Sequence, residues 1–124
     1  MATFKQLIKP YVEAELTLAE QAEQQGDLKR AFSHLENAHV LGQRCTYYHV
    51  KVHLHMFRHG WLTRDWQEVF GQIIRLIGAA TKTVFGLLPE GNTGGADVSA
   101  FKPMPLSAQH QQILHEVKKK RQAV

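Results

Sequence analysis

The sequence predicts an all-α fold, a compact bundle of about five helices arranged as antiparallel hairpins, with a long strap before the last helix. Helix signals recur along most of the chain, whereas strand signals are weak. Start and stop signals for helices lie close together, so consecutive helices should pack as antiparallel neighbours. A segment rich in glycine and proline, residues 89–106, interrupts this pattern near the C-terminus.

A chain of 124 residues is too short for two independent hydrophobic cores, so we expect one domain over residues 1–124. Within it we expect the bundle over 3–88, the strap over 89–106, and a C-terminal helix with a basic tail over 107–124. The strap is longer than most connections between helices, and loops of this length are usually functional or lie across a groove.

Each predicted helix has a boundary signal. The predicted helices cover residues 3–25, 28–41, 47–60, 65–88 and 107 to the basic tail. Gly26 suits the end of the first helix and Asp27 the N-cap of the second. Thr46 is a candidate N-cap for the third helix, which should end at Gly60, and Ser107 is one for the last.

The fourth predicted helix begins near Asp65, with Glu68 three residues later in the spacing of a capping box. Glycines at 71, 78 and 86 weaken it. It contains the most apolar stretch of the chain, residues 69–88, but polar and charged residues interrupt that stretch and make it a poor membrane span.

Charge and cysteine content exclude some functions. The net charge is +4, but four of the fifteen basic residues lie at 118–121, so the rest of the chain is neutral and nucleic-acid binding is not expected. The single cysteine, Cys45, excludes an intramolecular disulfide and indicates a reducing compartment. The first residues contain no apolar run of signal-peptide length, so we expect a cytoplasmic protein.

Histidine is unusually frequent, with eight residues, six of them between positions 34 and 59. In the third helix, His53 lies only about 40° around the axis from His49, because each residue advances the helix by about 100°. Met56 lies beside them, and the charged residues of this helix lie on the opposite side. Both rings are therefore predicted to face the core.

The first two predicted helices also carry polar side chains on their apolar faces. Glu15 lies in the middle of the apolar face of the first helix, and His39 follows the buried stripe of the second, flanked by Glu36. Buried carboxylates and imidazoles are costly unless they are paired or bind a metal. Histidines four residues apart on one helix face are a known metal-binding spacing.

We therefore predict a site for one divalent transition metal, Zn, Fe, Mn or Cu. Its predicted ligands are His39, His49 and His53, with Glu15 or Glu36 completing or orienting the site. Metal handling or sensing is the expected role. The residues fix no reaction, and a non-enzymatic role is favoured.

Several alternatives remain at this point. The same polar groups could form a structural network inside a helical interaction module, since the first hairpin has the small-residue pattern of a tetratricopeptide hairpin over about 25 residues. A protein partner or second copy would then dock on the strap or on an exposed apolar patch of the fourth helix. The groups could instead serve as acid and base in a ligand pocket, or Cys45 could act as a nucleophile. His34, His55 and His59 are expected at the surface.

Several motifs together resemble one family. They are Leu35-Glu36-x-Ala38-His39-x-Leu41-Gly42-Gln43, His49-x-x-x-His53, Gly60-Trp61, Asp65-Trp66, Gly91-Asn92-Thr93-Gly94-Gly95 and Phe101-x-Pro103-Met104-Pro105. This combination is similar to an uncharacterised bacterial family known as a domain of unknown function, over most of the chain up to Leu106. The resemblance implies a compact bacterial domain and no activity, so the metal prediction rests on the helix faces alone.

Overall fold

The computed structural model describes residues 2–84, 93–96 and 103–122, apart from the side chains of 81–84. Five helices make up the regular structure of this part: α1 (Phe4–Gln24), α2 (Leu28–Gly42), α3 (Thr46–Thr63), α4 (Trp66–Val84) and α5 (Ala108–Gln122). The prediction of an all-α fold with about five helices is confirmed. The predicted end of the fourth helix, 85–88, and strap residues 89–92 and 97–102 lie outside the described residues.

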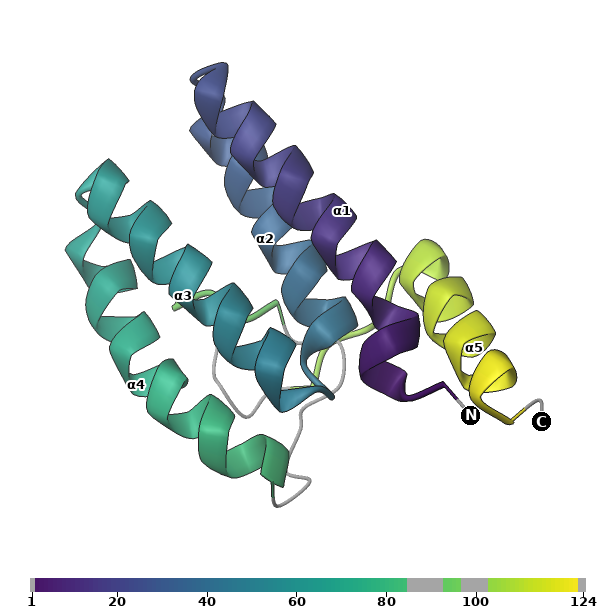
Figure 1. Cartoon of the computed structure of the whole chain (residues 1–124). Helices are drawn as coiled ribbons and strands as arrows, with labels where there is room; N and C mark the ends of the chain where they lie inside the picture. Colours follow the sequence, from purple (N-terminus) through teal and green to yellow (C-terminus); the bar gives the residue numbers. More distant parts are fainter. Residues whose placement is uncertain (1, 85–92, 97–102, 123–124) are drawn as a thin grey trace.

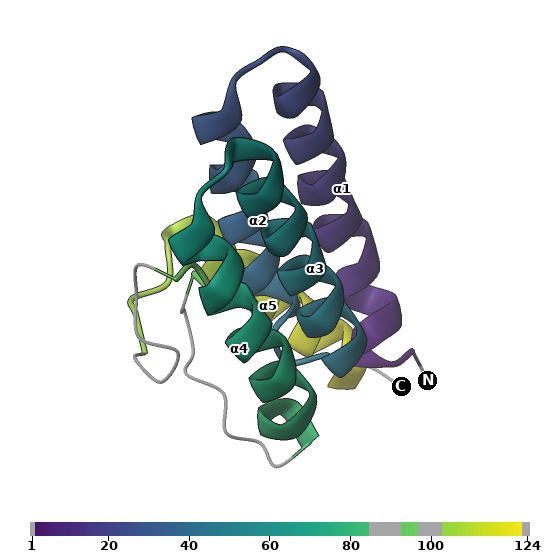
Figure 2. The ribbon, with the colours of Figure 1, turned by 90° about the vertical axis from the view of Figure 1, so that its left-hand side faces the viewer.

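The helices form two hairpins and a fifth, separate helix (Figure 1). α1 packs along α2 and α3 packs along α4, while α2 contacts α3 and so joins the two hairpins. α5 lies against α1 and α2 on the side of α1 that faces away from α4. Figure 2 looks onto the α3–α4 hairpin, with α4 on the side nearest the viewer. Among the five described helices, α4 packs against α3 alone.

The core lies where α1, α2 and α3 meet, with one contribution from α5. Its buried apolar residues are Ile8, Val12, Leu16, Ala19, Leu35, Ala38, Leu41, Tyr48, Val52, Met56 and Val117. Their spacing of three and four residues within each helix places them on one face per helix. The core therefore fixes which faces of α2 and α3 turn toward each other.

Three predicted caps are confirmed. The side chain of Asp27 accepts a hydrogen bond from the backbone N–H of Arg30 at 3.1 Å, and Ser107 accepts one from that of His110 at 3.1 Å. Gln25 is the C-cap of α1, and Gly26 follows it with a φ of +79°, a left-handed conformation that glycine adopts without a steric penalty. Asp65 also caps α4, accepting from the backbone N–H of Glu68 at 3.1 Å.

The third helix differs from its prediction at both ends. Thr46 is its first residue rather than its cap, and the N-cap is Cys45. The helix continues past Gly60 to Thr63, after which Arg64 turns the chain with a left-handed φ of 55°. Gly60 stays helical and serves a packing role, because a Cβ atom there would lie only 3.2 Å from Cγ2 of Val69 on α4.

Candidate metal centre

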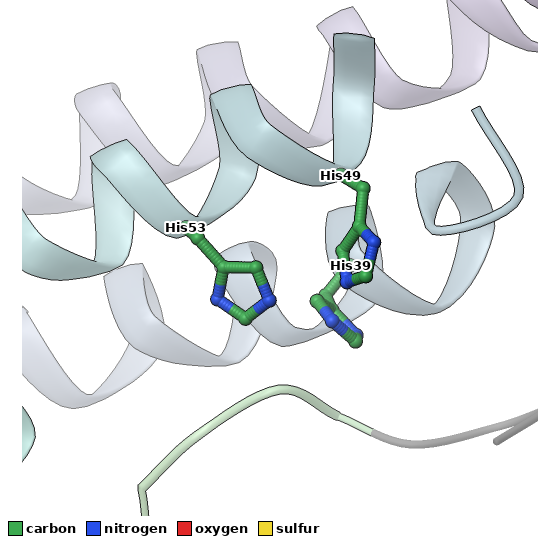
Figure 3. Close-up of side chains that lie close together, drawn as sticks. All are labelled: His39, His49 and His53. Carbon is green, nitrogen blue, oxygen red and sulfur yellow. The ribbon is translucent and has the colours of Figure 1, made fainter. Parts of the chain in front are cut away.

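Three buried histidines meet between α2 and α3. His39 comes from α2, and His49 and His53 lie one turn apart on α3. One ring nitrogen from each can be chosen so that all three lie within 4.8 Å of one another. The three residues are 3%, 5% and 2% exposed, so the cluster lies inside the protein (Figure 3).

The three rings are inclined to one another rather than stacked. Ring centroids are 5.0 Å apart for His39 and His49, 4.7 Å for His39 and His53, and 4.9 Å for His49 and His53. The planes of His39 make angles of 67° and 69° with those of the other two. Because the lone pair of an imidazole nitrogen lies in the plane of its ring, inclined rings can direct three nitrogens toward one point.

Close packing at the α2–α3 corner brings His39 near α3. A Cβ atom at Gly42 would lie 3.0 Å from Cβ of Tyr48 and 3.2 Å from Cγ2 of Val12. The missing side chain thus lets the end of α2 approach α1 and the first turn of α3. His39 lies three residues before Gly42, and His49 lies one residue after Tyr48. The close packing at this corner therefore places both rings at the same height along the axes of α2 and α3.

A second layer of polar residues comes from α4, and the sequence reasoning missed it. Gln72 is fully buried, and its Oε1 atom lies 2.5 Å from Nδ1 of His53 in a hydrogen bond. Its Nε2 atom donates to Oε1 of Glu68 at 2.7 Å and to the carbonyl oxygen of Gly94 at 2.9 Å. Glu68 is itself only 8% exposed. The signal that could have found them is the four-residue spacing of Glu68 and Gln72, which places both side chains on one face of the helix.

The described part of the strap covers the histidines. The backbone of Gly94 lies so close to His39 that an added Cβ atom would be 2.5 Å from Cδ2 of its ring. The backbone N–H of Ala96 donates to both carboxylate oxygens of Glu68, at 3.0 and 3.3 Å. Gly71 gives α4 room for this contact, since a Cβ atom there would overlap the Cβ atom of Ala96. Glycines at 71 and 94 thus allow the close contacts between residues 94–96, α4 and His39.

Glu15, one of the two predicted carboxylates, contacts other residues of α2. Glu15 forms a hydrogen bond with His34, whose Nδ1 lies 2.7 Å from Oε2, and it also accepts a hydrogen bond from Asn37 at 3.4 Å. Glu36 is partly exposed. Among the described residues, the group whose possible ligand atoms lie within 4.8 Å of one another contains neither glutamate. Glu68, on a helix that the prediction did not use, is a buried carboxylate linked to His53 through Gln72.

The expected surface position of His59 is wrong. His59 is 8% exposed, and its ring lies 5.2 Å from that of Phe32 between α3 and α2. Burial lowers its pKa below the usual value of 6.5. His59 lies seven residues after the buried Val52, so both face the same side of α3, whereas the prediction grouped His59 with the charged side. His34 and His55 are partly buried.

The apolar side of α4 faces outward. Phe70, Ile74 and Ile77 are 66%, 70% and 69% exposed, whereas Glu68 and Gln72 face the bundle. No helix in the described chain is both long and apolar enough to cross a membrane. The exposed patch that the sequence predicted for this helix, as the mark of a docking surface, is therefore present.

Comparison with known proteins identifies a family without adding an activity. Neither the curated proteins nor the solved structures contain a match to this chain. One family model matches residues 6–114, which include all five helices in whole or in part together with the three histidines and the α4 residues that contact them. The chain therefore belongs to the family described as "Protein of unknown function (DUF3703)".

Proposed function

We propose that this protein binds one divalent transition-metal ion through His39, His49 and His53. The observation that carries the proposal is the convergence of three buried imidazoles, whose nitrogen atoms lie within 4.8 Å of one another. Burying three polar rings at one point is costly unless the site satisfies them. A structural network can do so in pairs, but a metal ion binds all three nitrogens at once.

The geometry fits an ion after a small contraction. Zn–N bonds of about 2.0–2.1 Å in a tetrahedral site place the nitrogens roughly 3.3 Å apart. The longest separation here is at most 4.8 Å, so the rings would move together by up to about 1.5 Å. Rotation about the side-chain torsions of His49 and His53 supplies movements of this size without displacing α3.

The donor set favours some metals and some roles. Neutral imidazoles suit Zn²⁺, Fe²⁺ and Cu²⁺ better than Mg²⁺ or Ca²⁺, which prefer oxygen ligands. Three protein ligands leave a fourth position in a tetrahedral site for water or an exchangeable ligand. A buried site under a short strap suits a protein that holds or senses a metal. We therefore propose metal handling or sensing.

Metal titration of the purified, untagged protein tests the proposal. One equivalent of Zn²⁺ should bind, and it should raise the free energy of unfolding by about 2.7 kcal/mol when free Zn²⁺ is 100 times Kd. His39→Ala, His49→Ala and His53→Ala should abolish this effect. His115→Ala is the matched control, because His115 lies exposed on α5. Substoichiometric binding by the wild type, with no change in thermal stability, overturns the proposal.

We propose a second function for α4, pairing with a second copy of the chain. Six apolar side chains form the exposed patch, namely Trp61, Trp66, Phe70, Ile73, Ile74 and Ile77. The two tryptophan rings lie 5.5 Å apart, which joins the end of α3 to the patch. On α4, Trp66, Phe70, Ile73 and Ile77 follow the alternating four- and three-residue spacing of helices that pack on another helix.

The size of the patch favours a second copy as the partner. With aromatic side chains of 150–250 Å² each, the exposed fractions add to roughly 700 Å² per chain. Two copies face to face would bury about 1,400 Å², which lies within the range of stable interfaces. The exposed positions of the patch carry no charge, so identical surfaces would not repel each other.

Sedimentation analysis over a range of protein concentrations tests this pairing. The wild type should dimerise, and Phe70→Glu should be monomeric because it would bury a charge in the interface. Leu54→Glu is the control, since Leu54 is 52% exposed on α3 and lies outside the patch. A wild type that stays monomeric at all concentrations, or a dimer that Phe70→Glu leaves intact, overturns the pairing.

A further inference from the structure

The orientation of the Gln72 amide follows from its surroundings. One end faces the carbonyl oxygen of Gly94 and the carboxylate of Glu68, and the other faces His53. A backbone carbonyl can only accept hydrogen bonds, so the end that faces Gly94 must be the amide NH₂ group. Its two N–H bonds supply one donor each to Gly94 and Glu68. The amide oxygen therefore faces His53.

This orientation determines which nitrogen of His53 carries the proton. The Gln72 oxygen can only accept, so Nδ1 of His53 must donate and carries the hydrogen. A neutral imidazole has one protonated nitrogen, so the lone pair lies on Nε2. Figure 3 shows one ring nitrogen of His53 facing the other two rings and the second facing away from them. With Nδ1 bound to Gln72, the facing nitrogen is Nε2.

We infer that Gln72 and Glu68 are positioning residues of the metal centre, which hold His53 as an Nε2 ligand and supply the negative charge that its imidazoles lack. The inference rests on the proposed metal site. Ligating histidines usually donate their second N–H to a carboxylate or carbonyl, which fixes the ring and raises its basicity. Here the amide of Gln72 stands between the carboxylate and the ring.

The charge of Glu68 supports this role. Three neutral imidazoles bring no charge to offset a divalent cation, and a buried charge without compensation is costly. Glu68 is buried, and its oxygens accept from the side chain of Gln72 and the backbone of Ala96. These donors are uncharged amides. An ion bound to His53 would place a positive charge at the other end of the same hydrogen-bonded chain.

The same two side chains hold the strap over the site. Gln72 donates to the carbonyl oxygen of Gly94, and Glu68 accepts from the backbone of Ala96. Metal binding and docking of residues 93–96 therefore depend on one set of contacts. An ion that fixes His53 and Gln72 should raise the equilibrium constant for docking of the strap. The docked strap should raise the affinity for the ion by the same factor.

The tautomer of His53 can be measured without metal. In metal-free protein at pH 7.5, long-range ¹H–¹⁵N correlation spectra should show His53 protonated at Nδ1, with His53→Gln used to assign its signals. Gln72→Met keeps the length of the side chain and removes both hydrogen-bonding groups, so it should release this preference. Protonation at Nε2 in the wild type, or the same spectrum in Gln72→Met, overturns the inference.

Zn²⁺ affinity, measured by competition with a chromophoric chelator, provides the second test. Gln72→Met and Glu68→Gln should each weaken binding by about 10- to 100-fold at unchanged stoichiometry. Gln67→Met is the matched control, because Gln67 lies exposed on the same helix. If circular dichroism shows that Gln72→Met loses helix, Gln72→Leu replaces it.

The outcomes separate the two proposals. Wild-type affinity in both substituted proteins overturns the positioning role and leaves the metal site standing. A wild type that binds no Zn²⁺ overturns the metal site, and the positioning role with it, whichever tautomer the spectra show.

Discussion

Replacing Gly94 with alanine tests whether the strap lies against the histidines, and Gly26 offers a matched control. Both glycines have a left-handed φ, +85° at Gly94 and +79° at Gly26. An alanine in this conformation costs about 1–2 kcal/mol at either position. At Gly26 nothing lies within 4 Å of an added Cβ, whereas at Gly94 it would lie 2.5 Å from Cδ2 of His39.

The difference in stability between the two substituted proteins isolates the cost of the overlap between the added Cβ atom and the ring of His39. Overlap of this kind in a packed interior costs about 1–3 kcal/mol. Gly94→Ala should therefore lower the free energy of unfolding by about 1–3 kcal/mol more than Gly26→Ala, as measured by urea denaturation without metal. If the strap instead undocks to relieve the overlap, the extra loss is smaller and Zn²⁺ binds more weakly. Equal stability and equal Zn²⁺ affinity in the two proteins would refute the placement of residues 93–96.

Three further outcomes are expected. Met56→Ala, in the buried core on α3, should cost about 2–5 kcal/mol in chemical denaturation, whereas Leu54→Ala on the exposed face should stay within about 0.5 kcal/mol of the wild type. Stability should fall as the pH falls from 7.5 to 5.5. Burial lowers the pKa of His59 below its usual value of 6.5, so the unfolded chain binds a proton more readily than the folded protein does. His59→Leu should therefore reduce the dependence of the free energy of unfolding on pH, and an unchanged dependence would contradict this reasoning. Glu15→Gln should leave Zn²⁺ affinity unchanged in the chelator assay, because Glu15 bonds to His34; a marked loss would return Glu15 to the site.

The histidines could be predicted from the sequence because two local rules were sufficient. The helical repeat places His49 and His53 on one face of α3, and the apolar stripe of α2 shows which side of His39 is buried. The core residues on the same faces, such as Val52 and Leu35, confirm these assignments. The caps Asp27, Asp65 and Ser107 were predictable for the same reason, since a cap depends on a few adjacent residues, whereas the predicted cap Thr46 is the first residue of α3.

The contribution of α4 could not be predicted in this way. Its apolar side is the exposed one, so the rule that apolar faces are buried turns the helix the wrong way round. Glu68 and Gln72 face inward because they find partners in His53 and in the backbone of the strap, which are distant in sequence. The pairing of Glu15 with His34 rather than with the three histidines likewise depends on the relative shift of α1 and α2 along their axes, which periodicity does not determine.

The position of α4 at the edge of the bundle has a consequence for how an ion would reach the histidines. α4 packs against α3 alone among the described helices, and it contacts strap residues 94 and 96 through Glu68, Gln72 and Gly71. We expect a helix that packs on a single neighbouring helix to open at a lower free energy than the protein as a whole. The backbone amides of α4 should exchange with solvent deuterium sooner than those of α1 and α2. Ion exchange would then follow the opening rate of this one helix, while the core of α1, α2 and α3 stays folded.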